Sequence, residues 1–326
     1  MSSSTGAHPG APDPDLSPTP ARASPKVIYI MGAGHSGSTI LGVALGNCEG
    51  MFFAGELDKY LLRSGVPVLG GLERTRFWAR VRELVPQARE LYGNEAHRQL
   101  ERSSAALDPS GVRRRRQLGA RFRGVTGALM GAIASTAGAS HVIDTSHFPL
   151  RARELQRTDG IELYLVFLVR DPQAVVASTN RLLRSRGLAR RAANVLKTNA
   201  ELWLTYALSL RVFGNQPPER RVFVRYEDFV AEPESVLRQV LRRGGSAPEL
   251  PDLDALRTGL AFHANRLIES DVVALKRGGS ATSARGSSRI TSILQRPWSA
   301  VFARLGAGGT QAAGAPGRRW GRGGGT

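Results

Sequence analysis

The sequence predicts an α/β protein with a central parallel sheet, and three observations lead to this prediction. Apolar, β-branched runs alternate with stretches whose apolar residues recur at helical spacing. Residues 161–169 form the most apolar run and are typical of a strand covered on both faces. A Gly-rich turn at residues 32–37 separates one expected strand from one expected helix. Alternating strands and helices indicate a three-layer architecture with the sheet in the middle.

The elements are expected in the following order along the chain. Strands are predicted at residues 27–30, 51–54, 141–144, 161–169 and 221–225. Helices are predicted from the apolar spacing at residues 40–45, 57–62, 72–101, 113–137, 150–157, 172–183, 192–213 and 233–243. Beyond residue 244 the regularity fades.

Both ends of the chain differ in composition from the middle. Residues 1–25 are rich in Pro, Ser, Gly and Ala, and residues 302–326 are rich in Gly and Ala. Such segments bury little apolar surface, so we expect a disordered arm and a disordered tail around one folded domain at residues 26–301.

Composition and charge limit the class of protein. The net charge of +18 is carried mostly by arginine, which reflects either solvated surfaces or attraction to anions. Cys48 is the single cysteine, which excludes a disulfide framework and a Cys-based metal site. No secretory leader and no apolar run of membrane-spanning length is visible, so we expect a cytoplasmic protein without a transmembrane segment.

The Gly-rich turn has the pattern of a phosphate-binding loop. Glycines let backbone N–H groups approach an oxyanion, and the start of the following helix favours negative charge. The spacing of Gly32 and Gly37, followed by Ser38 and Thr39, resembles a Walker A loop, but Ser38 stands where that motif has lysine. The turn is therefore interpreted either as a phosphate loop or as a structural turn.

Other candidate residues follow predicted strands, where open parallel sheets bind ligands. Arg170 follows residues 161–169, and Ser178 lies eight residues further on, so the pair either grips a phosphate or caps a helix and faces solvent. Glu56 follows a strand that we expect beside the Gly-rich loop, where it either performs chemistry or caps the next helix. Residues 144–147 either cap a helix or line the same cleft.

Taken together, these stretches resemble the sulfotransferases that use 3′-phosphoadenosine 5′-phosphosulfate (PAPS), in the bacterial and carbohydrate-type branch. Five segments carry the resemblance in the order of the family: GAGHSGST at 32–39, the G-E pair at 55–56, DTSHFPLRA at 144–152, LVRDPQAVVASTNR at 168–181 and RYEDFVAEPESVL at 225–237. The resemblance spans residues 26–243.

The resemblance implies a P-loop-like fold and transfer of a sulfuryl group from PAPS to a hydroxyl or amine, without a metal. It implies that the 5′-phosphosulfate is held by Gly34, His35, Ser36, Gly37, Ser38 and Thr39. It further implies that Arg170 and Ser178 hold the 3′-phosphate. Glu56 is then the general base, and His35, with His147, stabilises charge on the leaving oxygen.

The chain also departs from the family pattern. His35 and His147 stand where the family carries a lysine or arginine, and there is no R-K-G segment like that of the small cytosolic members. A neutral imidazole still donates one hydrogen bond, and its pKa should rise beside phosphates. A sulfotransferase-like scaffold that binds the cofactor without turnover therefore remains an alternative.

Two other classes of protein remain as alternatives. A P-loop kinase or NTPase predicts ATP and Mg²⁺ binding, but Ser38 counts against it. A nucleic-acid-binding protein is suggested by the basic run at residues 113–116, but no aromatic residues interleave the basic runs, so we expect no nucleic-acid partner. The acceptor is expected to be a small molecule, a carbohydrate or a lipid, bound by residues 58–137 and 245–300, and peripheral membrane contact stays open.

Overall fold

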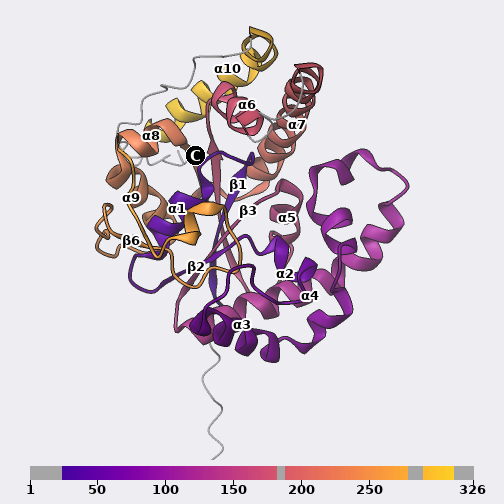
Figure 1. Ribbon diagram of the computed structural model, residues 1–326, viewed down its shortest axis with the longest axis vertical. Helices are drawn as coiled ribbons and strands as arrows, with labels where there is room; N and C mark the ends of the chain where they lie inside the picture. The colour runs from indigo at the N-terminus through magenta and orange to yellow at the C-terminus, as the bar shows by residue number, and fades with distance from the viewer. Residues whose placement is uncertain (1–23, 182–187, 278–288, 312–326) are drawn as a thin grey trace, which may run out of the picture.

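The structure is a computed structural model that describes residues 24–181, 188–277 and 289–311 (Figure 1). The expected N-terminal arm lies outside the described residues except for its last two positions, and residues 312–326 of the expected tail lie outside them as well. None of the described helices combines the length and the apolarity that crossing a bilayer requires.

A parallel sheet of five strands in the order β2-β3-β1-β4-β5 forms the centre of the described fold. Its strands are β1 (Lys26–Gly32), β2 (Met51–Gly55), β3 (His141–His147), β4 (Glu162–Val169) and β5 (Arg221–Arg225). A short antiparallel pair, β6 (Leu256–Arg257) and β7 (Val272–Val273), lies apart from it. The predicted α/β class with a central parallel sheet is confirmed.

Helices cover both faces of this sheet. The longer ones are α1 (Ser38–Gly46), α3 (Leu72–Leu84), α4 (Val112–Ala137), α6 (Pro172–Arg181), α7 (Leu188–Asn215), α9 (Pro233–Arg243) and α10 (Arg289–Gln311), and the shorter ones are α2 (Asp58–Leu62), α5 (Pro149–Leu155) and α8 (Tyr226–Ala231). In Figure 1, α1, α8 and α9 lie on one side of the sheet, and α5 and α7 lie on the other.

Alternation along β1 explains this layering. Val27, Tyr29 and Met31 belong to one buried cluster, shared with residues of α4, α5 and α7. Ile28 and Ile30 belong to a second buried cluster, shared with residues of α1 and α9. Because successive side chains of a strand point to opposite faces, a strand that is apolar at every position requires cover on both sides.

The second strand is not placed as we expected. β2 is an edge strand that pairs with β3, and β3 pairs with β1 in turn. Glu56 therefore does not follow a strand adjacent to the Gly-rich loop, because β3 occupies that place. β3 also continues to His147, past the expected end at residue 144, since its partners in β1 extend to Met31.

The stretch at residues 72–101, expected as one helix, is divided. α3 ends at Leu84, and a 3₁₀ helix at Pro86–Leu91 and a π-helical turn at His97–Glu101 follow. Pro86 lacks an N–H group and disfavours helical geometry at Val85, whose φ and ψ are −127° and 59°. The chain therefore turns where a regular helix would continue.

The last described helix, α10, crosses the expected start of the tail at residue 302. Its side chains Trp298 and Phe302 are buried, and the two rings lie 5.8 Å apart. Phe302 also contacts Tyr206 edge-on at 4.9 Å. Two aromatic residues four positions apart thus anchor this helix on the core, across the position where we expected the tail to begin.

Candidate functional site

The Gly-rich turn connects β1 to α1 and is shaped by close packing. A Cβ atom on Gly32 would lie 2.1 Å from the carbonyl oxygen of Leu168, and one on Gly37 would lie 2.3 Å from the ring of Tyr226. Gly37 also has φ = 96°, in the left-handed region that favours glycine. Both positions therefore require glycine. The two glycines of the Walker-like spacing are fixed by their contacts.

The start of α1 is open to an anion. No side chain caps it, and its first turn contains no acidic residue. Ser36, Ser38 and Thr39 are buried beside it, and the Ser36 hydroxyl has no hydrogen-bond partner. Because the first N–H groups of a helix lack partners within it, this arrangement offers donors to a negatively charged group.

His35 and His147 both have left-handed backbones, with φ of 64° and 56°. For residues other than glycine such geometry is uncommon and is associated with functional sites. The His35 side chain is exposed. Atom Nε2 of His147 lies 4.0 Å from the point that a Cβ on Gly34 would occupy, so its ring faces the loop.

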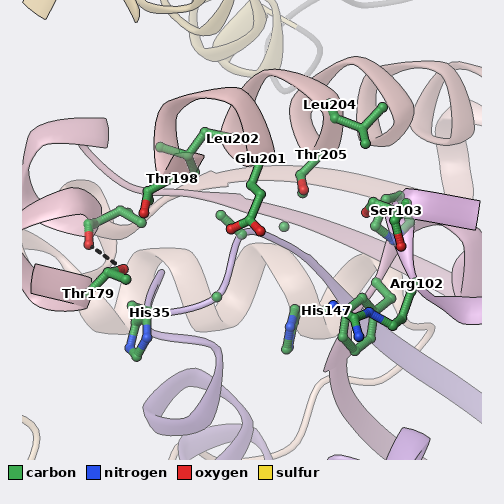
Figure 2. Close-up of a pocket in the computed structure, with 17 residues that line it drawn as sticks. His35, Arg102, Ser103, His147, Thr179, Thr198, Glu201, Leu202, Leu204 and Thr205 are labelled. Atoms are coloured by element: carbon green, nitrogen blue, oxygen red, sulfur yellow. Dashed lines mark hydrogen bonds between the residues drawn. The ribbon is translucent and has the colours of Figure 1, made fainter. Parts of the chain in front are cut away.

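A cavity of about 310 Å³ opens in front of these two histidines (Figure 2). It is lined by residues 32–35 of the loop, residues 102–104, residues 147–149, Val175 and Thr179 of α6, and Thr198, Glu201, Leu202, Leu204 and Thr205 of α7. Figure 2 shows the Glu201 carboxylate reaching from α7 toward the space between His35 and His147.

The residues that α7 contributes were missed by the sequence analysis, which expected the acceptor walls at residues 58–137 and 245–300. Only residues 102–104 of this cavity come from those ranges. Thr198, Glu201, Leu202 and Thr205 have the spacing of one helix face. A helix face that mixes polar and apolar residues in this way was the signal in the sequence that could have indicated a cavity wall.

Arg170 lies against the loop but does not line the cavity. Its Nη1 donates a hydrogen bond of 3.2 Å to the carbonyl oxygen of His35. Its guanidinium also lies over the ring of Tyr226, 4.5 Å from the ring centre. The ring of Tyr226, in turn, packs against Gly37. Ser178 is half-buried on α6 and does not line the cavity either.

Glu56 is paired with a residue that the sequence analysis did not identify. Its carboxylate accepts a hydrogen bond from Nδ1 of His263 at 2.9 Å, and both side chains are largely buried. His263 lines a second hollow, together with His35 and residues 264–269. His35 therefore borders both hollows. Glu56 is connected to the second hollow by its hydrogen bond to His263.

Asp144 and Ser146 do not line the cleft, contrary to one of our two interpretations. Both are fully buried because β3 continues through them. Asp144 accepts a bond from Nε of Arg151 at 3.0 Å, and Arg151 also donates to Glu101. His97 contacts Glu101 at 2.8 Å. This buried cluster of charges supports the turn that presents His147.

The surroundings set the charge of these groups. Burial lowers the pKa of His147 below 6.5, although the carboxylates of Glu56 and Asp58 act in the opposite direction. Burial therefore favours the neutral form of this ring, and the cationic role expected for His147 stays a prediction. Burial alone would lower the pKa of Arg151, but Asp144 and Glu101 outweigh it and raise the pKa. No group of three or more metal-ligating side chains occurs within the described residues.

Comparisons with known proteins agree with this architecture. A sequence profile described as the sulfotransferase family matches residues 25–247. The chain belongs to the sulfotransferase family. A comparison with curated proteins found no match.

Two solved structures are similar to this chain. The sulfotransferase domain from the Synechococcus PCC 7002 olefin synthase has a TM-score of 0.50 and 17% identity, covering 86% of this chain and 97% of that one. The sulfotransferase domain from the curacin biosynthetic pathway has a TM-score of 0.49 and 19% identity, covering 85% of this chain and 98% of that one. Because the sequence identity is only 17%, the similarity to the olefin synthase domain supports the fold and nothing about function.

Proposed function

We propose that this chain transfers a sulfuryl group from PAPS to a hydroxyl or amine of an acceptor. The observation that carries the proposal is the open start of α1 at the Gly-rich loop, with the buried, unpartnered hydroxyl of Ser36 beside it. Membership of the sulfotransferase family supports the class of reaction. We propose the identity of the donor, the kind of acceptor and the role of each residue in addition to this class of reaction.

The donor would be bound by residues on and beside the loop. When bound, PAPS supplies a sulfuryl group attached to a phosphate that can leave. The backbone of Gly34, His35 and Gly37, with Ser36, Ser38 and Thr39, would hold the 5′-phosphosulfate. Arg170 donates one of the five N–H groups of its guanidinium to the His35 carbonyl. The remaining N–H groups, together with the hydroxyl of Ser178, would bind the 3′-phosphate.

The acceptor would occupy the cavity in front of α7, with its reacting group near His35. The walls there combine the Glu201 carboxylate with the hydroxyls of Thr198, Thr205 and Ser103, which suit a polar acceptor. His35 would stabilise the negative charge that develops at the loop. His147, neutral and facing Gly34, would offer one hydrogen bond there.

Glu56 and His263 would remove the proton of the acceptor. The carboxylate binds Nδ1 of the imidazole, which leaves Nε2 able to accept a proton. A pair of this kind holds the base in one tautomer and stabilises the cation that forms on protonation. Glu56 thereby keeps the proposed role in proton removal, acting through the ring of His263.

Thermal-shift measurements with nucleotides test the donor. 3′-Phosphoadenosine 5′-phosphate (PAP) should raise the melting temperature without added metal, because a ligand of the native state stabilises it by mass action. Adenosine 5′-phosphosulfate should do so less, because it lacks the 3′-phosphate. A shift with ATP and Mg²⁺ but none with PAP would replace the proposal by a P-loop kinase.

A further inference from the structure

An apolar patch is exposed where α7 and α10 meet. It consists of Leu196 and Trp203 on α7 and Ile290, Ile293 and Leu294 on α10, all of them exposed. Trp203 donates a hydrogen bond of 2.8 Å to the carbonyl of Leu294, and Asn199 donates one of 3.1 Å to Thr291. These bonds hold the two helices side by side, so the five side chains form one surface.

The packing of α10 explains why this surface is apolar. Thr291, Gln295, Trp298 and Phe302 recur at helical spacing and are buried on the core side. Ile293 therefore lies opposite to this face, and Ile290 and Leu294 lie on the flank between, although a surface turned to water is ordinarily polar. Exposed apolar residues that cluster in this way mark interaction sites more often than scattered ones do.

The charges around the patch indicate its partner. Lys197, Arg289 and Arg296 are exposed on the same two helices. Lys197 lies 3.8 Å from the carboxylate of Glu201, which reaches into the cavity. We propose that the patch docks on an anionic lipid bilayer, with its Leu, Ile and Trp side chains inserted at the interface and its basic residues on the headgroups.

A second copy of the chain fits this surface less well. The net charge of +18 makes two copies repel each other, whereas it attracts the chain to an anionic membrane. Trp at the edge of an apolar patch with Lys and Arg around it is also the composition of interfacial helices. The charge complementarity therefore favours the bilayer.

The patch and the cavity lie on different sides of α7. Leu196 and Trp203 share one face of α7, and Thr198, Glu201 and Leu202, which line the cavity, lie on the roughly opposite face. In Figure 1 the start of α10 and the first half of α7 lie together at the upper end of the molecule. Docking through this patch would therefore leave the cavity facing away from the lipid, so docking is independent of the proposed function.

Co-sedimentation of the full chain with lipid vesicles tests docking. Phosphatidylcholine vesicles that contain phosphatidylglycerol should bind the wild type, and pure phosphatidylcholine vesicles should bind it less. The substitutions Ile293→Ser and Leu294→Ser together should weaken binding by at least about tenfold, because two apolar side chains no longer enter the interface. Neither substitution changes the net charge, so general attraction to anionic lipid is held constant.

Leu107→Ser is the matched control. Leu107 is 70% exposed, nearly as much as Ile293 at 72%, but it lies on a 3₁₀ helix outside the patch. Its replacement should leave vesicle binding unchanged. Circular dichroism melts of all variants establish that they are folded.

Tryptophan fluorescence gives a second, independent readout. Vesicles should shift the emission to shorter wavelength, and Trp203→Phe should abolish the shift. Equal vesicle binding by wild type and the Ile293→Ser/Leu294→Ser variant overturns the proposal. A loss of dimer in sedimentation velocity on the same substitutions, without an effect on vesicles, assigns the patch to a second copy instead. PAP binding is measured separately, so the proposed function can fail while docking holds.

Discussion

Glu56 and His263 are joined at two points although 207 positions separate them in the chain. The carboxylate accepts a bond from Nδ1 at 2.9 Å, and the backbone N–H of Glu56 donates one of 2.7 Å to the carbonyl of His263. Gly55 pairs with His263 as an isolated parallel bridge. The loop that carries His263 therefore extends the edge of the sheet beside β2, and the imidazole is held in a fixed orientation.

This pair gives the first prediction. Glu56→Gln should lower turnover by about 10²–10⁴ while PAP binding is unchanged, because the imidazole loses the carboxylate that orients it. His263→Asn should lower turnover to a similar extent. If the two groups act as one unit, the double variant should be little worse than either single variant.

The measurement is turnover with an acceptor found by screening, alongside calorimetric titration with PAP. Glu201→Gln is the control from the same region, since it removes a carboxylate that lines the cavity but does not contact His263. It should change the KM for the acceptor more than kcat. Near-wild-type turnover of Glu56→Gln and His263→Asn would show that the base lies elsewhere, with His147 the next candidate.

Arg170 and Tyr226 give the second prediction. Arg170→Ala should weaken PAP binding by at least about tenfold, because hydrogen bonds to charged groups are worth about 1.5–3 kcal/mol each. Arg170→Lys keeps the charge but loses the planar fork and should recover only part of the affinity. Tyr226→Ala removes the ring under the guanidinium and should weaken PAP binding less than Arg170→Ala.

Calorimetric titration of PAP measures these affinities without an acceptor. Ser178→Ala serves as the comparison within the same proposed subsite, and we expect a smaller loss because it removes one neutral donor. If Arg170→Ala binds PAP as wild type does, this arginine only supports the loop through the His35 carbonyl.

The fold could be predicted from the sequence because its signals are local. The apolar run that became β4 and the Gly-rich turn between β1 and α1 are both contiguous, and each reports one strand or one turn. The order of the strands in the sheet could not be predicted in this way. β3 lies between β2 and β1 because segments far apart in the chain pair with each other, and the periodicity within one segment does not encode this pairing.

The site was predictable in part for the same reason. Gly34, His35 and His147 belong to short motifs and do lie around one cavity. His263 and Glu201 belong to no such motif, and their positions follow from a loop added to the sheet edge and from the packing of α7. The buried Arg151 was also missed, because a charged residue in a short helix gives no sign of burial until Asp144 and Glu101 are placed around it.

The packing of α10 gives the third prediction. Phe302→Ala should lower the free energy of unfolding by about 3–5 kcal/mol, the usual cost of removing a buried aromatic ring. Arg304→Ala, an exposed position on the same helix, should change it by less than about 0.5 kcal/mol. Urea denaturation followed by circular dichroism measures both. Equal stability of the two variants would mean that α10 does not pack on the core in solution.

Two histidines whose pKa values are lowered by burial, His141 and His147, give the last prediction, which concerns stability and pH. Burial lowers the pKa values of His147 and His141 below 6.5 in the native state. In the unfolded chain both rings bind a proton as the pH falls through about 6.5, while the native rings stay neutral. The unfolded state therefore holds more protons below this pH.

The sign of the effect follows from this difference. Stability is fully present above pH 6.5 and decreases as the pH falls, until the native rings are themselves protonated. Each ring contributes a slope of at most about 1.4 kcal/mol per pH unit within that interval. Urea denaturation at a series of pH values from neutral to mildly acidic measures the slope. His147→Asn and His141→Asn should each make it shallower. An unchanged slope in both variants would contradict the burial of these rings, because a ring that titrates alike in both states adds no pH dependence.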